Sequence, residues 1–168
     1  WRNMNSKINL SEDEKDCLQE LMNVAYGNAT AAITEILDAY AKLSIPKIQI
    51  INSSELKAHL SRELNLDVEH LVSLQQINGT ISGENMFVID KQSAINIAYK
   101  FGLSEDEIND NELLDIVLEI TNILSSSTIS KLAEDIDTNV SFSAPSIKSL
   151  TSINQLNNSF ISKYEKVI

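Results

Sequence analysis

A glutamate followed three positions later by an asparagine occurs twice in this chain of 168 residues. The two pairs are Glu20 with Asn23 and Glu119 with Asn122. Residues three apart project side by side from a helix, so each pair places a negative acceptor beside an amide that both donates and accepts hydrogen bonds. Such an amide can orient a water molecule without deprotonating it. This suits hydrolysis of an activated phosphoryl group, because positioning the attacking water accounts for most of that catalysis.

The two copies also match at two further positions. An aspartate precedes each glutamate by four positions, at Asp16 and Asp115, and a proline follows each asparagine by 23 positions, at Pro46 and Pro145. All four positions of the second copy lie 99 residues after those of the first. A single copy would be interpreted as an ordinary solvated helix face. Four matches in register instead predict a duplicated structural unit and favour a duplicated site.

Both motifs are predicted to lie on long helices. Ser11 and Glu14 form a capping-box pattern, which predicts a helix from near residue 11 to about residue 41. A second helix is predicted from about residue 111 to residue 135. At about 100° per residue, the acid and amide of each motif point away from the apolar stripe of their helix. The residues predicted to face the core are Leu18, Leu21, Met22, Ala25, Ala29, Ala32, Ile33, Ile36 and Tyr40, then Val117, Ile120, Leu124 and Leu132.

A small residue stands beside each motif, Gly27 in the first copy and Ser126 in the second. Small side chains at these positions would allow another molecule to approach the helix closely. An exposed helix face is a poor pocket for a small substrate, but it can insert into the active site of another protein. The expected place of chemistry is therefore the surface where a partner meets the helix.

Alternating apolar and polar residues predict strands between and after the two helices. Residues 82–85 are predicted to form a hairpin turn, and Gly79 is expected to permit a bulge. Short helices are predicted over residues 55–63 and 93–101. The predicted strands cover residues 47–51, 71–81, 86–90 and 140–147, with the beginning of a further strand at 165–168.

These elements predict a mixed α/β fold of the α+β type. Two long motif-bearing helices would pack on a mainly antiparallel sheet in one internally duplicated domain, residues 4–168. The first unit would span about residues 10–102 and the second about residues 103–168. Only 23 residues follow Pro145, so the second unit is expected to lack an equivalent of the hairpin in the first. An unpaired sheet edge there would invite pairing between chains.

Composition argues against several functional classes. The chain has 24 acidic and 13 basic residues, a net charge of −11 and no basic cluster, so nucleic acid is an unfavourable partner. No apolar run reaches the roughly 20 residues that span a bilayer, and the N-terminus lacks a signal-peptide pattern. We therefore expect a soluble, cytoplasmic protein, and the single cysteine, Cys17, fits that reducing compartment. His59 and His70 lie far from both motifs in the sequence, and no Cys/His cluster indicates a metal site.

The motif resembles the signature of the CheC/CheX/FliY phosphatases of bacterial chemotaxis. That signature is an Asp or Ser, three residues, a Glu, two residues, an Asn, 22 residues and a Pro, and both copies here fit it. Residues 23–32 are similar to the continuation of the family's motif helix, and residues 79–83 resemble its central hairpin. The resemblance covers roughly residues 10–147. It is strongest to CheC, because both copies are complete here whereas CheX carries a single site.

The resemblance implies hydrolysis of the phospho-aspartate of CheY, the response regulator of chemotaxis. It implies that Asn23 and Asn122 orient the attacking water, and that Glu20 and Glu119 engage a lysine in the active site of the regulator. The chain itself would bind no cofactor, because the regulator supplies Mg²⁺. Phosphorylated CheY would be the main partner, and the receptor deamidase CheD is a second candidate partner.

Other interpretations stay open on the sequence alone. The chain could be a non-enzymatic adaptor that binds phosphorylated CheY or CheD, or a FliY-like component of the flagellar switch. It could also be a duplicated domain whose polar helix faces have no function. Asp16 and Asp115 belong to the motif, and each could support its helix or contact a partner. The decay rate of phosphorylated CheY separates an enzyme from a binding protein.

Overall fold

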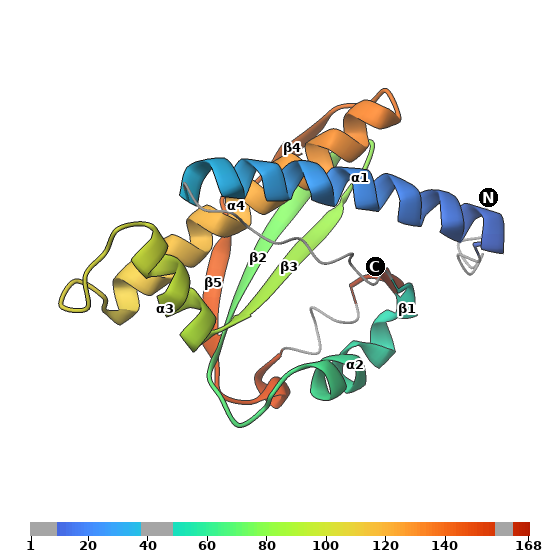
Figure 1. The fold of residues 1–168 in the computed structure, drawn as a ribbon. Coiled ribbons are helices and arrows are strands. Elements are labelled where there is room, and N and C mark those ends of the chain that lie inside the picture. The colour runs from blue at the N-terminus through green and yellow to red at the C-terminus, as the bar shows by residue number, and fades with distance from the viewer. Residues whose placement is uncertain (1–9, 38–48, 157–162) are drawn as a thin grey trace.

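The computed structural model describes residues 10–37, 49–156 and 163–168 (Figure 1). The α-helices in these residues are α1 (Glu12–Leu37), α2 (Leu56–Glu63), α3 (Lys91–Lys100) and α4 (Asp110–Asp135). The strands are β1 (Ile51–Asn52), β2 (His70–Gly79), β3 (Gly83–Asp90), β4 (Val140–Phe142), β5 (Ser146–Leu150) and β6 (Lys166–Val167). Two short 3₁₀ helices, η1 (Ser53–Glu55) and η2 (Ile153–Gln155), complete the order. These elements confirm the predicted mixed α/β fold class.

α1 begins where its capping box predicts, and α4 begins one residue before its predicted start at residue 111. The backbone N–H of Ser11 donates to Oε2 of Glu14 at 2.7 Å, and the backbone N–H of Glu14 donates to the Ser11 hydroxyl at 3.2 Å. These reciprocal bonds form the capping box of α1. At the start of α4, Oδ1 of Asn109 accepts hydrogen bonds from the backbone N–H groups of Asn111 and Glu112. Each cap satisfies N–H groups that have no partner within the helix itself.

β2 is the central strand of a four-stranded antiparallel sheet, with β3 along one edge and β4 and β5 along the other (Figure 1). β2 and β3 form the predicted hairpin, but its turn is at residues 80–82 and not at 82–85. The reason lies at Gly79, which has φ +137° and approaches β4 closely. A Cβ at Gly79 would lie 2.5 Å from the carbonyl oxygen of Asn139, so the chain can leave β2 here only with a glycine.

The pairing of β2 shifts by one residue between β4 and β5. Ile77 pairs with Phe142 on β4, whereas Leu74 pairs with Ser146 on β5. Two residues of β2 therefore face three residues of the opposite segment, 143–145, and this extra residue defines a β-bulge. The last residue of the bulge is the proline of the second motif, whose missing N–H removes no hydrogen bond from the ladder. The bulge that we predicted at the end of β2 lies instead on the facing strand.

Helices cover both faces of the sheet. α3 and α4 pack on one face, where they cover a first cluster of buried apolar residues. α2 lies over the other face, where Leu60 packs against a second apolar cluster. Residues that alternate along β2 point to opposite faces, so Leu71 joins the first cluster and Val72 the second. The buried residues of the first cluster are Leu71, Ala94, Ala98, Leu113, Ile116, Val117 and Ile120. Those of the second are Val72, Leu150 and Leu156.

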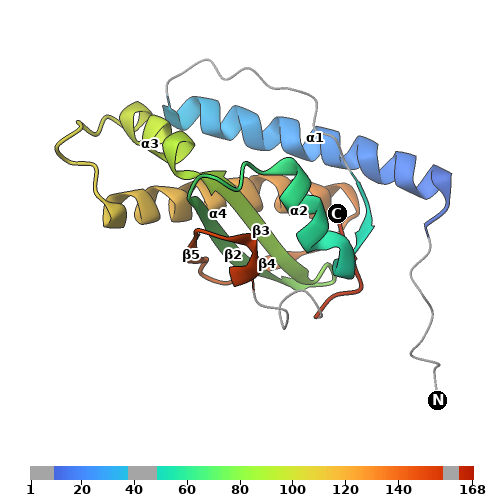
Figure 2. The same cartoon turned by 90° about the horizontal axis from the view of Figure 1, so that it is seen from below.

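α1 forms an outer layer that crosses α4 (Figures 1 and 2). Its fully buried residues, Ala25 and Ala29, are one turn apart and small enough to let the helices approach closely. Near the crossing, Nδ2 of Asn28 donates to the carbonyl oxygen of Ser127 at 3.4 Å. Asn28 and Ser127 are 99 residues apart, which is the offset that relates the two motifs. The duplication and the bounds of its two units remain predictions.

The structure differs from some of the predictions for where these elements begin and end. Ile36 is 48% exposed and is not a core residue, because it lies near the end of α1. Tyr40, Pro46 and the first two residues of the predicted strand at 47–51 lie outside the described residues. Of the other three, Ile51 alone is in a strand, β1. The strand expected at residues 165–168 is present as β6, and it pairs antiparallel with β1.

Among the helices of the described residues, α4 alone has the length and apolar composition of a segment that could cross a membrane. A third of that apolar stretch, 33%, is buried inside the protein. A core helix that packs on a sheet passes the same test, and α4 is such a helix.

Candidate active site

α4 carries the second motif on its exposed side. Asp115, Glu119 and Asn122 are all exposed, whereas Val117 and Ile120 on the inner side are buried. Within the described ranges, the carboxylates of Asp115 and Glu119 have no hydrogen-bond or ion-pair partner. Both acids therefore face solvent and can bind a group from another molecule.

The carboxamide of Asn122 is held from below by the sheet. Its Oδ1 accepts a hydrogen bond from Nε2 of Gln75 at 3.1 Å. The same Nε2 also donates to the carbonyl oxygen of Ser143 in the bulge, at 2.9 Å. Gln75 is only 1% exposed, so this link runs from the interior to the exposed end of Asn122.

Further buried polar contacts join the same turn of α4 to the sheet. The hydroxyls of Ser73 and Thr121 share a hydrogen bond, and the Thr121 hydroxyl also contacts the carbonyl oxygen of Val117 at 2.7 Å. Nδ2 of Asn85 on β3 donates to the hydroxyl of Ser125 at 2.6 Å. A satisfied buried bond contributes about 1 kcal/mol, and an unmade one costs about 1–3 kcal/mol. These contacts therefore fix how far α4 can slide or rotate on the sheet.

The sequence prediction did not include Gln75 or the other members of this polar layer. A signal for it exists in β2, where Ser73 and Gln75 occupy alternate positions on either side of Leu74. Because alternate residues share a face, two polar residues on a buried strand indicate polar contacts with whatever packs on that face. The sequence does not say that the packing element is α4, since α4 follows much later in the chain.

The first motif on α1 has different surroundings. Asp16 and Glu20 are exposed, as predicted from the helical spacing, and Asn23 is half-buried. Oδ1 of Asn23 is buried and has no hydrogen-bond partner within the described residues. Gly27 leaves open space next to it, because a Cβ at this position would meet no atom of the described residues within 4 Å beyond the adjacent backbone of α1. The first asparagine thus lacks the support that Gln75 gives to the second.

The structure does not bring the two motifs together into one site. In the described part of the chain, no hydrogen bond or ion pair joins a residue of one motif to a residue of the other. The two helices are linked further along, by Asn28 and Ser127. Each motif therefore forms its own surface, and Pro145 is the only motif proline whose place is described.

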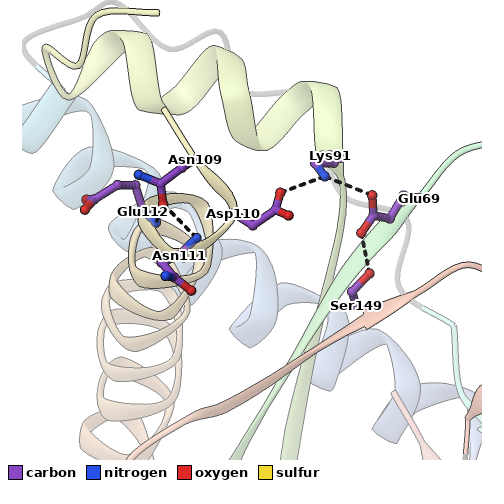
Figure 3. Close-up of polar contacts among 7 residues, drawn as sticks. All are labelled: Glu69, Lys91, Asn109, Asp110, Asn111, Glu112 and Ser149. Atoms are coloured by element: carbon purple, nitrogen blue, oxygen red, sulfur yellow. Dashed lines mark hydrogen bonds and ion pairs between the residues drawn. The ribbon is translucent and has the colours of Figure 1, made fainter. Parts of the chain in front are cut away.

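A charged network anchors the beginning of α4 (Figure 3). Nζ of Lys91 lies 2.9 Å from Asp110 and 3.1 Å from Glu69, and Glu69 also accepts a hydrogen bond from the Ser149 hydroxyl. These contacts link the first residues of α3 and α4 to β5. Asp110 and then Glu69 raise the pKa of the Lys91 ammonium, while the Ser149 hydroxyl and then Lys91 lower the pKa of the Glu69 carboxyl. The network positions the beginning of α4, upstream of the second motif.

In residues 10–37, 49–156 and 163–168, no three His, Cys, Asp or Glu side chains gather in a way that could hold a metal ion. The motif acids stand apart on exposed helix faces. Supply of Mg²⁺ by the partner remains part of the hypothesis for the function.

Two solved structures have a similar fold. The chain is similar to FliY from Thermotoga maritima, with 24% sequence identity and a TM-score of 0.70, over 88% of this chain and 73% of that one. It is also similar to the middle domain of FliM from H. pylori, with 12% identity and a TM-score of 0.53, over 88% of this chain and 77% of that one. At these identities the likeness shows the fold alone. A comparison with curated protein sequences gave no match.

A protein family matches the chain over residues 71–161, more than half of its length. The family is described as chemotaxis phosphatase CheX. The matched residues include the second motif, from Asp115 to Pro145, and begin after the first motif has ended. The closer likeness to CheC, which depends on the first motif, therefore remains a prediction. The match over β2, β3, α3 and α4, together with the fold, shows that this chain belongs to the CheX family of chemotaxis phosphatases.

Proposed function

We propose that this chain hydrolyses the phospho-aspartate of the response regulator CheY at the exposed faces of α1 and α4. One observation carries the proposal: Glu119 and Asn122 project from α4 into solvent, and the carboxamide of Asn122 is fixed by a hydrogen bond to a buried side chain. Orienting a water molecule needs a group of defined direction. Membership of a phosphatase family supports this use of the site.

The proposed reaction needs no strong base. The oxygen of a water molecule forms a bond to phosphorus, while the bond from phosphorus to the aspartate carboxylate oxygen breaks. The aspartate leaves as a carboxylate with the bonding electron pair, and the proton of the water passes to phosphate and solvent. Because a carboxylate is a good leaving group, in-line placement of the water is the main requirement.

In this proposal Asn122 and Asn23 orient the water, and Glu119 and Glu20 bind a cationic group of the regulator. The exposed acids are free for such a contact, and an acid that pairs with a lysine fixes the distance between the asparagine and the phosphoryl group. A convex helix can enter a shallow active site on another protein. The Mg²⁺ that screens the phosphoryl charge belongs to the regulator.

The direct test is the decay of phosphorylated CheY in Mg²⁺ with and without the protein. We expect the double variant Asn23→Ala, Asn122→Ala to lose all acceleration of the decay, because neither site can then hold the water. Asn111→Ala is the matched control: it makes the same substitution on an exposed residue of α4 whose side chain has no hydrogen-bond partner among the described residues. We expect this control to retain the full rate.

An undiminished rate in the double variant would rule out the proposed function. If the wild-type protein binds phosphorylated CheY tightly without changing its decay, the chain is an adaptor and not an enzyme. Thermal unfolding of each variant shows whether the fold is intact, so that a lost rate is assigned to the site.

A further inference from the structure

Gln75 occupies a position where an apolar residue would be expected. It lies in the central strand β2 and is 1% exposed, and its Oε1 is buried without a hydrogen-bond partner among the described residues. A buried polar atom without a partner is unfavourable, and an apolar side chain of similar size would avoid it. Packing of the core therefore does not explain why a glutamine occupies this position, and its hydrogen bonds must serve another purpose.

The hydrogen bonds around Gln75 determine which way its amide points. The carbonyl oxygen of Ser143 can only accept, so the nearby end of the Gln75 amide must be Nε2. Nε2 has a second hydrogen, and this hydrogen needs another acceptor. Asn122 provides it by turning its Oδ1 toward Gln75. The amide directions thus follow from the network and leave no freedom for a flip.

The bulge holds the other end of this network. The backbone N–H of Ser143 donates to the carbonyl oxygen of Gln76 at 3.0 Å, and the backbone N–H of Gln76 donates to the Ser143 hydroxyl at 3.0 Å. The extra residue of the bulge turns the Ser143 carbonyl oxygen toward Gln75 on the face that α4 covers. Pro145 restricts the backbone at the end of the same bulge. The motif proline is therefore connected to the motif asparagine through Ser143 and Gln75.

We propose that Gln75 is a positioning residue for Asn122, which it holds with Oδ1 inward and both N–H groups of Nδ2 directed to the attacking water and the partner. This inference rests on the proposed function and adds to it the direction of the amide. Nδ2 of Asn122 donates to no described residue, so both of its hydrogens are available. Gln75 itself touches neither water nor substrate, because it is buried beneath Asn122.

The test replaces Gln75 by methionine, which has a similar size and no donor. The substitution is made in two backgrounds: Asn23→Ala, where turnover depends on Asn122, and Asn122→Ala, where it depends on Asn23. In the first background we expect kcat for phosphorylated CheY to fall about tenfold to a hundredfold with unchanged KM, because the amide is no longer oriented. In the second background we expect no further loss. Gln92→Met, an exposed substitution on α3, is the matched control and should change neither value.

Equal losses in both backgrounds, or a raised KM, would show a general structural effect and overturn the inference. An unchanged kcat in the Asn23→Ala background would also overturn it. If the Asn122→Ala background has no turnover, the two kinetic constants in the Asn23→Ala background decide: a lowered kcat with unchanged KM supports positioning, and a raised KM contradicts it. A full rate of CheY dephosphorylation in the Asn23→Ala, Asn122→Ala variant would overturn the proposed function itself. That result is distinguishable from a failure of this inference, because it does not depend on the effect of Gln75→Met.

Discussion

The carboxamide oxygen of Asn122 accepts a hydrogen bond from Gln75. The carboxamide oxygen of Asn23 is buried without a hydrogen-bond partner in the part of the chain that the structure describes. A buried oxygen of this kind costs about 1–3 kcal/mol, so the side chain of Asn23 is less firmly fixed in one direction. Placement of the water depends on that direction. At the scale of single residues, the two motifs are therefore alike in sequence and different in support.

We expect the second site to contribute more of the activity than the first. Asn122→Ala should lower the rate of CheY dephosphorylation more than Asn23→Ala does, by a factor of about ten if positioning is worth 1.4 kcal/mol. The measurement is the decay of phosphorylated CheY with each single variant at equal concentration. Equal losses would show that the surroundings of the two asparagines do not matter for turnover.

Asp90 provides a residue-scale test of stability that does not involve the site. As the N-cap of α3, its carboxylate accepts hydrogen bonds from the hydroxyl of Ser93 at 2.6 Å and from its backbone N–H at 2.8 Å. These bonds, the hydroxyl first, hold the pKa of Asp90 below its ordinary value of 3.8. Because the folded pKa is lowered, the stabilisation is complete above the unfolded pKa and is lost as the pH falls through the folded one.

Asp90→Ala should therefore lower the free energy of unfolding by about 1 kcal/mol at pH 7. The difference from the wild type should shrink once the pH is below about 3.8 and the cap becomes protonated. Urea unfolding at pH 7 and at pH 3 measures both values. Asp106→Ala, at an exposed acid between α3 and α4, serves as the control and should change little at either pH. A difference that does not depend on pH would contradict this account of the cap.

Helix spacing alone predicts which motif residues face outward, and the structure has Asp115, Glu119 and Asn122 exposed. Gln75 could not be identified in the same way. Its partner depends on which helix covers β2, and that is decided by tertiary packing rather than by local sequence.

At the scale of elements, α1 has a gap in its surface beside the first motif. Gly27 lies one turn after Asn23, and apart from its chain neighbours and the adjacent backbone of α1 no atom of the described residues lies within 4 Å of where its Cβ would be. Glycine within a helix is destabilising by about 1 kcal/mol relative to alanine. The chain thus carries a helix-weakening residue that its own packing does not require.

We expect Gly27→Ala to raise the free energy of unfolding by about 0.5–1 kcal/mol. Gly27→Phe should keep the fold but raise KM for phosphorylated CheY in the Asn122→Ala background, because the ring fills the space through which a partner approaches. Urea unfolding and steady-state kinetics measure the two effects. Gly102→Ala is the contrasting control, since Gly102 has φ +90° and its substitution should destabilise the chain. An unchanged KM for Gly27→Phe would show that the partner does not contact this part of α1.

The capping signal locates the start of α1 from the sequence because a cap is a local interaction between residues three apart. The turn after β2 and the bulge opposite it are different. The turn depends on the close approach of Gly79 to Asn139, and the bulge on the facing strand, so both need contacts between segments far apart in the chain. The predictions of a turn at 82–85 and of a bulge at Gly79 were wrong for this reason.

At the scale of the whole molecule, the predicted class is confirmed, and the layering is new information. The sheet, α4 and α1 form successive layers, so that the first motif helix lies over the second (Figure 2). Amphipathic spacing shows that α1 has an apolar side, but not which element covers it. The sequence predicts a strand at residues 165–168 but not the pairing of β6 with β1, because that pairing joins segments far apart in the chain.

The link from Gln75 to Asn122 also bears on how such a chain can be inherited. Gln75 lies in the segment 10–102 and Asn122 in the segment 103–168, so a gene fragment for the later segment would transfer the complete second signature and leave its support behind. A match to the motif in another protein is then not enough to show that the protein has a working site. Its activity depends on whether a donor from a separate strand was copied with it, and a search for relatives that work should examine that strand as well as the motif.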